Sequence, residues 1–165
     1  MIQKKICLLG AFAVGKTSLV SRFVYHAFSE KYLATVGVRI DKKSIHVNGQ
    51  EIVLMVWDLA GQDEFQRVRV SYLRGSSGYL LVADGTRPDT LDEALRIQQW
   101  LVGDMGPLPF VLAINKSDLA GQWQLSDAAI DELQARGWHC LVTSAKTGDG
   151  VESAFHALAA RMVAG

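Results

Sequence analysis

Residues 10–17 read Gly10-Ala11-Phe12-Ala13-Val14-Gly15-Lys16-Thr17. They match the pattern G-x-x-x-x-G-K-[ST], in which backbone N–H groups surround an anion, the lysine reaches the outer phosphates and the hydroxyl is available to Mg²⁺. The apolar run Ile6-Cys7-Leu8-Leu9 before the loop predicts a buried strand, and the residues from Ser18 onward predict a helix. A strand, a glycine-containing loop and a helix in this order indicate a protein that binds a nucleoside triphosphate.

Strand-like and helix-like patterns alternate along the rest of the chain. Asn48-Gly49 can supply the two positive-φ residues of a tight turn, so a hairpin is expected across 37–58. The alternation elsewhere predicts parallel strands with helices on both faces. We therefore expect an α/β P-loop NTPase fold over residues 1–165 as a single domain, with a mostly parallel six-stranded sheet and one antiparallel edge strand. The other expected strands are 2–9, 78–84, 109–115 and 138–143; the expected helices are about 16–25, 89–102, 126–136 and 150–163, with a turn at 103–109.

Composition limits the classes of function. Seventeen basic and seventeen acidic residues cancel, so no nucleic-acid partner is expected. Cys7 and Cys140 lie in apolar runs and are expected to be buried free thiols, as in a reducing compartment. We find no secretion signal, no membrane span of about 18 apolar residues and, at 160–165, no cysteine for prenylation. A cytoplasmic protein without a direct lipid anchor is expected.

Asp58 ends a predicted buried strand and is followed closely by Gly61 and Gln62. A carboxylate at that point, near a phosphate loop, suits Mg²⁺ binding through water, because this cation prefers oxygen ligands and keeps several waters. The N–H of Gly61 can approach a terminal phosphate, and Gln62 can orient an attacking water.

Two further loops suit a guanine base. Asn115-Lys116-Ser117-Asp118 follows a predicted strand, and the two acceptor oxygens of Asp118 match the adjacent N–H donors of guanine, which adenine lacks. The hydrocarbon stem of Lys116 can lie over the purine ring. After the next strand come Ser144, Ala145 and Lys146, where the Ala145 N–H can meet the guanine carbonyl and Lys146 can cover the other face of the ring.

Thr35 lies between the first helix and the hairpin. Its hydroxyl can give Mg²⁺ a second ligand only when a terminal phosphate holds this segment closed, which would let the segment sense the nucleotide. The alternative is that Thr35 simply starts a strand, and spacing does not separate the two.

Taken together, these motifs resemble those of Ras-superfamily small GTPases, closest to the Rab branch, over essentially the whole chain. The resemblance implies a G domain that switches between GDP and GTP with Mg²⁺, hydrolyses GTP slowly and is controlled by exchange and activating proteins. It adds Phe28 as a ring against the guanine edge. It also implies switches at 29–39 and 60–72, with effector, exchange and activating proteins bound through residues 29–40 and 57–74.

The expected site residues follow from these motifs and the resemblance. The catalytic residues would be Gln62, Lys16 and Gly61, and the metal would be held by Thr17, Thr35 and, through water, Asp58. The nucleotide-binding residues would be Gly10, Ala11, Phe12, Ala13, Val14, Gly15, Lys16, Thr17, Ser18, Phe28, Thr35, Gly61, Asn115, Lys116, Asp118, Ser144, Ala145 and Lys146.

The sequence also departs from the family pattern. Ile40 stands where Rabs usually carry Phe in a triad with Trp57 and Tyr72, so effector specificity does not carry over. Leu59 and Asp63 replace the usual Thr and Glu, while Arg67 and Arg69 are solvated switch charges or, alternatively, internal arginine fingers.

Phe12 is the departure with the greatest functional weight, since Ras has glycine there and many Rabs a small polar residue. A ring here would crowd Gln62 and an incoming arginine finger, or it would turn outward onto a switch segment or a partner. Two function classes follow: a regulatory GTPase, favoured by Gln62, and a guanine-nucleotide-binding scaffold with little hydrolysis, favoured by Phe12. An ATP-dependent enzyme is disfavoured by Asp118.

Overall fold

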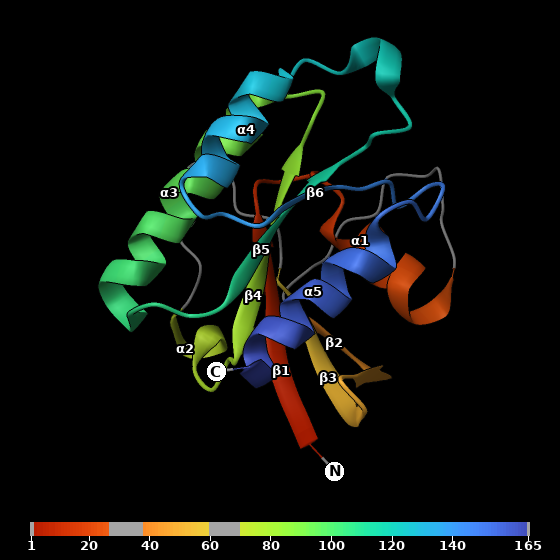
Figure 1. Cartoon of the computed structure of the whole chain (residues 1–165), viewed down its shortest axis with the longest axis vertical. Coiled ribbons are helices and arrows are strands. Elements are labelled where there is room, and N and C mark those ends of the chain that lie inside the picture. Colours follow the sequence, from red (N-terminus) through yellow and green to blue (C-terminus); the bar gives the residue numbers. More distant parts are fainter. Residues whose placement is uncertain (1, 27–37, 60–69, 165) are drawn as a thin grey trace.

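The computed structural model describes residues 2–26, 38–59 and 70–164. A six-stranded sheet lies between two layers of helices (Figure 1). Its strand order is β2-β3-β1-β4-β5-β6, with β2 antiparallel to β3 and all other neighbours parallel, as the sequence predicts. The strands are β1 (Ile2–Gly10), β2 (Val38–Val47), β3 (Gln50–Leu59), β4 (Gly78–Asp84), β5 (Phe110–Asn115) and β6 (Cys140–Val142).

The helices divide between the two faces of the sheet (Figure 1). Two of them, α1 and α5, cover one face, and three others, α2, α3 and α4, cover the opposite face. None of the helices in the described ranges is long and apolar enough to cross a membrane. The helices are α1 (Lys16–Tyr25), α2 (Val70–Leu73), α3 (Pro88–Met105), α4 (Asp127–Ala135) and α5 (Val151–Ala164), with one 3₁₀ turn, η1 (Ala120–Gln122).

The expected hairpin is present as β2 and β3. Asn48 and Gly49 form its turn with φ values of 52° and 79°, and the first pair beyond the turn is Val47 with Gln50. Positive φ at both central residues matches the twist of the adjoining strands, which explains why an Asn-Gly pair specifies the register.

The prediction of a turn at 103–109 is wrong for its first three residues, because α3 continues to Met105. A single glycine inside a helix costs only about 1 kcal/mol relative to alanine, so Gly103 does not stop it. The helix ends at Gly106, whose φ of 75° leaves the helical region and whose N–H donates to the carbonyl of Val102. The short α2 and η1 were not expected, since segments this short carry no periodic pattern.

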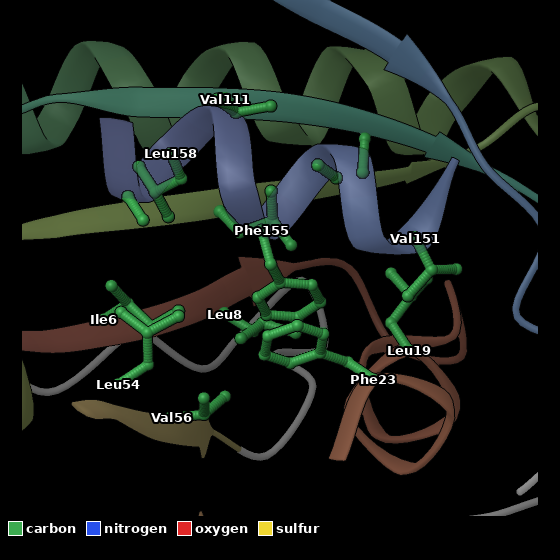
Figure 2. Close-up of a cluster of buried hydrophobic side chains, with 14 of the residues drawn as sticks. Ile6, Leu8, Leu19, Phe23, Leu54, Val56, Val111, Val151, Phe155 and Leu158 are labelled. Carbon is green, nitrogen blue, oxygen red and sulfur yellow. The ribbon is translucent and has the colours of Figure 1, made fainter. Parts of the chain in front are cut away.

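The core between the sheet and the α1/α5 layer contains a stacked pair of aromatic rings. Phe23 from α1 and Phe155 from α5 are fully buried, with ring centroids 4.0 Å apart and planes inclined by 2° (Figure 2). Aromatic pairs of this kind add about 0.5–1.5 kcal/mol beyond the area that they bury. The stack fixes α1, which begins inside the phosphate loop, against α5.

Cys7 and Cys140 are free and buried, as expected. Burial raises the pKa of both thiols, because a low-dielectric surrounding disfavours the thiolate. Both cysteines belong to the core beneath α3 and α4.

Candidate functional site

The motif loops meet at one edge of the sheet. The register pairs Asp58 on β3 with Leu8 on β1, and Asp84 on β4 with Asn115 on β5. Carboxyl ends of parallel strands therefore converge there, as they do at ligand sites in open α/β sheets.

The loop between β1 and α1 needs both of its glycines. Gly15 has a φ of 105°, and a Cβ placed on it would lie 2.3 Å from Nδ2 of Asn115. A Cβ on Gly10 would lie 2.3 Å from the carbonyl oxygen of Val82 on the neighbouring strand. No side chain fits at either distance, so the spacing of the two glycines is a steric requirement of this packing.

Lys16 lies folded back along the loop. Its ammonium donates to the carbonyls of Gly10 and Ala11, both at 3.1 Å. Burial lowers the pKa of Lys16 to about 8, an effect that the Asp58 carboxylate opposes and the positive charge of Arg87 reinforces. Anionic oxygens beside this ammonium would stabilise its charged form.

Thr17 and Asp58 form the candidate magnesium site. The Thr17 hydroxyl donates to Oδ2 of Asp58 at 2.7 Å, and the Asp58 side chain is 0% exposed. Hydroxyl and carboxylate oxygens suit Mg²⁺, which is held by few protein ligands together with waters and phosphate oxygens. Within the described segments, no group of three or more His, Cys, Asp or Glu side chains is placed to hold a metal.

Asn115 joins three loops through one buried amide group. Its Nδ2 donates to the carbonyl of Val14 at 3.1 Å. Its Oδ1 accepts from the Thr143 hydroxyl at 3.1 Å and from the N–H of Ala145 at 3.3 Å. The phosphate loop, the end of β5 and the loop after β6 thus share one side chain.

Ser144 orients Asp118. The Ser144 hydroxyl donates to Oδ1 of Asp118 at 2.7 Å and accepts from the N–H of Thr147 at 3.1 Å. A carboxylate held in this way presents acceptors to a ligand with paired N–H donors, such as a guanine base.

Lys116 reaches the phosphate loop. Its ammonium donates to the carbonyl of Ala13 at 3.0 Å and lies 2.9 Å from Oδ2 of Asp84. Lys116 has a φ of 75°, uncommon for a residue with a side chain and often associated with functional loops.

Three side chains of this edge were missed by sequence reasoning. Arg22 on α1 donates through Nε to the carbonyl of Ala145 at 2.8 Å and through Nη2 to that of Lys146. Asp84 and Arg87 lie at the end of β4 and the start of α3. A signal for Asp84 existed, since a carboxylate there ends an entirely apolar strand as Asp58 does, but Arg87 and Arg22 carry no such pattern.

The remaining predicted residues lie outside the described segments. These are Phe28, Thr35, Gly61 and Gln62, together with most of both switches. Of the three triad positions, Ile40 is exposed and pairs in register with Trp57, whose ring lies under the ammonium of Lys5 at 3.7 Å. Tyr72 is partly buried against the α3 side of the core.

A sheet of this topology, with a G-x-x-x-x-G-K-[ST] loop between its first strand and first helix, defines a P-loop nucleotide-binding protein. The family model "Ras family" matches residues 5–164. The chain belongs to the Ras family, and its similarity to Rab proteins makes it a Rab-like small GTPase.

Among its relatives, the human Ras-related protein Rab-30 is 37% identical over 164 residues, covering 96% of this chain and 79% of the relative. Ras-related protein Rab-4 of Dictyostelium discoideum is 34% identical over 157 residues, covering 92% and 75%. Ras-related protein Rab-13 of Canis lupus familiaris is 32% identical over 160 residues, covering 94% and 77%. Family membership supports GTP binding, GTP hydrolysis and dependence on Mg²⁺ in general terms, with regulators and effectors as the general kind of partner.

Proposed function

We propose that this protein is a molecular switch that binds GDP and GTP with Mg²⁺ at the loop of residues 10–17 and slowly hydrolyses GTP. The observation that carries the proposal is the Asn115 amide, which bonds the phosphate loop to the two loops expected to hold the base. One side chain thereby sets the spacing between the site for phosphates and the site for guanine.

Each residue has a definite role in this proposal. Lys16 and the loop N–H groups stabilise the charge of the transferring phosphoryl group, while Gly61 supports the terminal phosphate and Gln62 positions water. Thr17 and Thr35 supply hydroxyl ligands to Mg²⁺, with Asp58 acting through water. When bound, the cation neutralises part of the charge of the phosphates.

The guanine base is held by Asp118 and the Ala145 N–H at its edge and by Lys116 and Lys146 at its faces, with Phe28 as an additional ring. Effectors and regulators act through residues 29–40 and 57–74. We place the protein in the cytoplasm, as a single G domain over residues 1–165.

A phosphate-release assay with GTP tests the switch, and Gln62→Leu is its control. We expect slow release from the parent, further slowed in Gln62→Leu because the water loses its orienting amide. Binding without release by the parent would favour the scaffold, and equal affinity of the parent for ATP and GTP would overturn the guanine assignment.

Asp118→Asn tests the choice of base. Asn replaces one acceptor oxygen with an NH₂ group that faces a guanine donor, leaving polar groups unpaired at about 1–3 kcal/mol each. We expect the affinity for GDP to fall by about a hundredfold and the affinity for xanthosine diphosphate to rise. Competition of both nucleotides against a fluorescent GDP analogue measures this. An unchanged preference for guanine would remove Asp118 from the base site.

Phe12 favours the scaffold as a second candidate function, because its side chain is 49% exposed on the phosphate loop. In this second proposal the ring crowds Gln62 and the arginine finger of an activating protein, as the family resemblance implies. We expect Phe12→Gly to accelerate single-turnover GTP hydrolysis by about tenfold, which corresponds to roughly 1.4 kcal/mol of activation free energy. An unchanged rate would show that the ring does not slow intrinsic hydrolysis.

A further inference from the structure

Every backbone carbonyl from residue 10 to residue 14 accepts a hydrogen bond from a side chain. Lys16 accounts for the first two, and Lys116 and Asn115 for the carbonyls of Ala13 and Val14. The carbonyl of Phe12, in the middle, accepts from Nη2 of Arg87 at 2.9 Å. In a planar trans peptide the N–H points opposite to the C=O, so fixing the carbonyls fixes the directions in which the N–H groups point.

Arg87 is itself held by a buried carboxylate. Its Nε lies 3.0 Å from Oδ2 of Asp84, whose side chain is only 1% exposed. The same oxygen pairs with Lys116 at 2.9 Å. Burial alone would raise the pKa of Asp84, but hydrogen bonds from Thr86, Lys116 and Arg87 together lower it, so the group is a carboxylate at neutral pH. One anion therefore fixes two cations that hold adjacent carbonyls of the loop.

The turn from β4 to α3 sets Arg87 in place before any ligand binds. The Arg87 N–H donates to the carbonyl of Asp84 at 2.9 Å, and the Thr90 hydroxyl donates to the carbonyl of Arg87 at 2.7 Å. The backbone N–H and the hydroxyl of Thr86 both donate to Oδ1 of Asp84, at 2.8 and 2.6 Å. Pro88 begins α3 with a fixed φ. A side chain on such a rigid turn can position a binding loop accurately.

We propose that Arg87 is a positioning residue for the phosphate loop: paired with Asp84, it holds the carbonyl of Phe12 so that the loop N–H groups are directed toward the phosphates. The inference rests on the proposed nucleotide-binding function. Arg87 acts through the main chain of the loop, so its role is independent of the side chain at position 12.

The first test is the dissociation rate of a fluorescent GDP analogue from the parent, Arg87→Ala, Arg87→Lys and Arg96→Ala. We expect Arg87→Ala to release GDP about tenfold faster, the loss of one charge-assisted hydrogen bond at a partly exposed site. Arg87→Lys should recover only part of the loss, because Arg87 bonds Asp84 through Nε and the Phe12 carbonyl through Nη2, two donors held at a fixed spacing by the planar guanidinium. Arg96→Ala is the matched control: this exposed arginine of α3 pairs with Glu93 one turn earlier and should leave the rate unchanged.

The second test compares GDP with GMP as competitors, since GMP has one phosphate fewer for the loop to hold. We expect Arg87→Ala to lower the affinity for GDP more than the affinity for GMP. General damage to the fold would lower both affinities by the same factor. Equal weakening of GDP and GMP binding, or an unchanged GDP off-rate, would each overturn the positioning role. If the parent bound no guanine nucleotide, the proposed function itself would fail; a parent that binds GDP with an unaffected Arg87→Ala variant would defeat only this inference.

Discussion

Asn115→Ala should weaken GDP binding by about a thousandfold, or roughly 4 kcal/mol. The substitution removes the donor to the Val14 carbonyl and the acceptor for Thr143 and Ala145. Each unpaired buried group costs about 1–3 kcal/mol, so we also expect the free energy of unfolding to fall by about 3 kcal/mol. Equilibrium titration with a fluorescent GDP analogue and urea denaturation without nucleotide measure the two effects.

Thr143→Val is the graded control for Asn115. It removes only the hydroxyl that donates to Oδ1 of Asn115 and leaves the bond from Asn115 to the phosphate loop in place. We expect GDP affinity to fall by less than about tenfold. If the two variants lost affinity equally, the bond from Asn115 to Val14 would contribute nothing to GDP binding beyond the bond to Thr143.

Lys16→Ala should also weaken GDP binding by about a thousandfold, because charge-assisted hydrogen bonds to phosphate are among the strongest in proteins. Its effect on folding should be small by comparison. The lowered pKa of Lys16 means that burial disfavours its charge in the folded protein. Lys16→Ala removes this desolvation penalty and also removes two hydrogen bonds to loop carbonyls, so the two effects on the free energy of unfolding partly cancel. Titration with GDP measures the loss of affinity, and denaturation without nucleotide measures the change in stability.

Lys42→Ala is the matched control for Lys16, since Lys42 is an exposed lysine on β2. It should change neither GDP affinity nor stability measurably. A Lys16→Ala variant that lost stability and affinity in proportion would indicate a structural lysine, in conflict with the role proposed for its ammonium.

The sequence was sufficient to predict most of the fold, because local backbone requirements leave clear patterns. Asn48-Gly49 encodes a turn, and Gly10 and Gly15 are placed where a Cβ would collide with Val82 or Asn115. The end of α3 was less accurately predicted, because the pattern at Gly103 indicates the start of a turn. The helix ends only before Gly106, which adopts a positive φ and is followed by Pro107.

The candidate site was predictable where one short motif supplies both position and chemistry, as with Lys16 or Asp118. Arg87 was not, because Phe12, whose carbonyl it bonds, is 75 positions away in the sequence and is brought to it by the pairing of β1 with β4. The bridging role of Asn115 likewise depends on three loops meeting, which no single stretch of sequence records.

The contacts of α1 have a consequence for how a nucleotide would leave. This helix starts at Lys16 in the phosphate loop. Arg22, less than two turns later, donates hydrogen bonds to the main-chain carbonyls of Ala145 and Lys146. The stack of Phe23 on Phe155 also packs the helix against α5. A partner that levered α1 outward would therefore loosen both ends of a bound nucleotide in a single motion, and release would be concerted rather than stepwise.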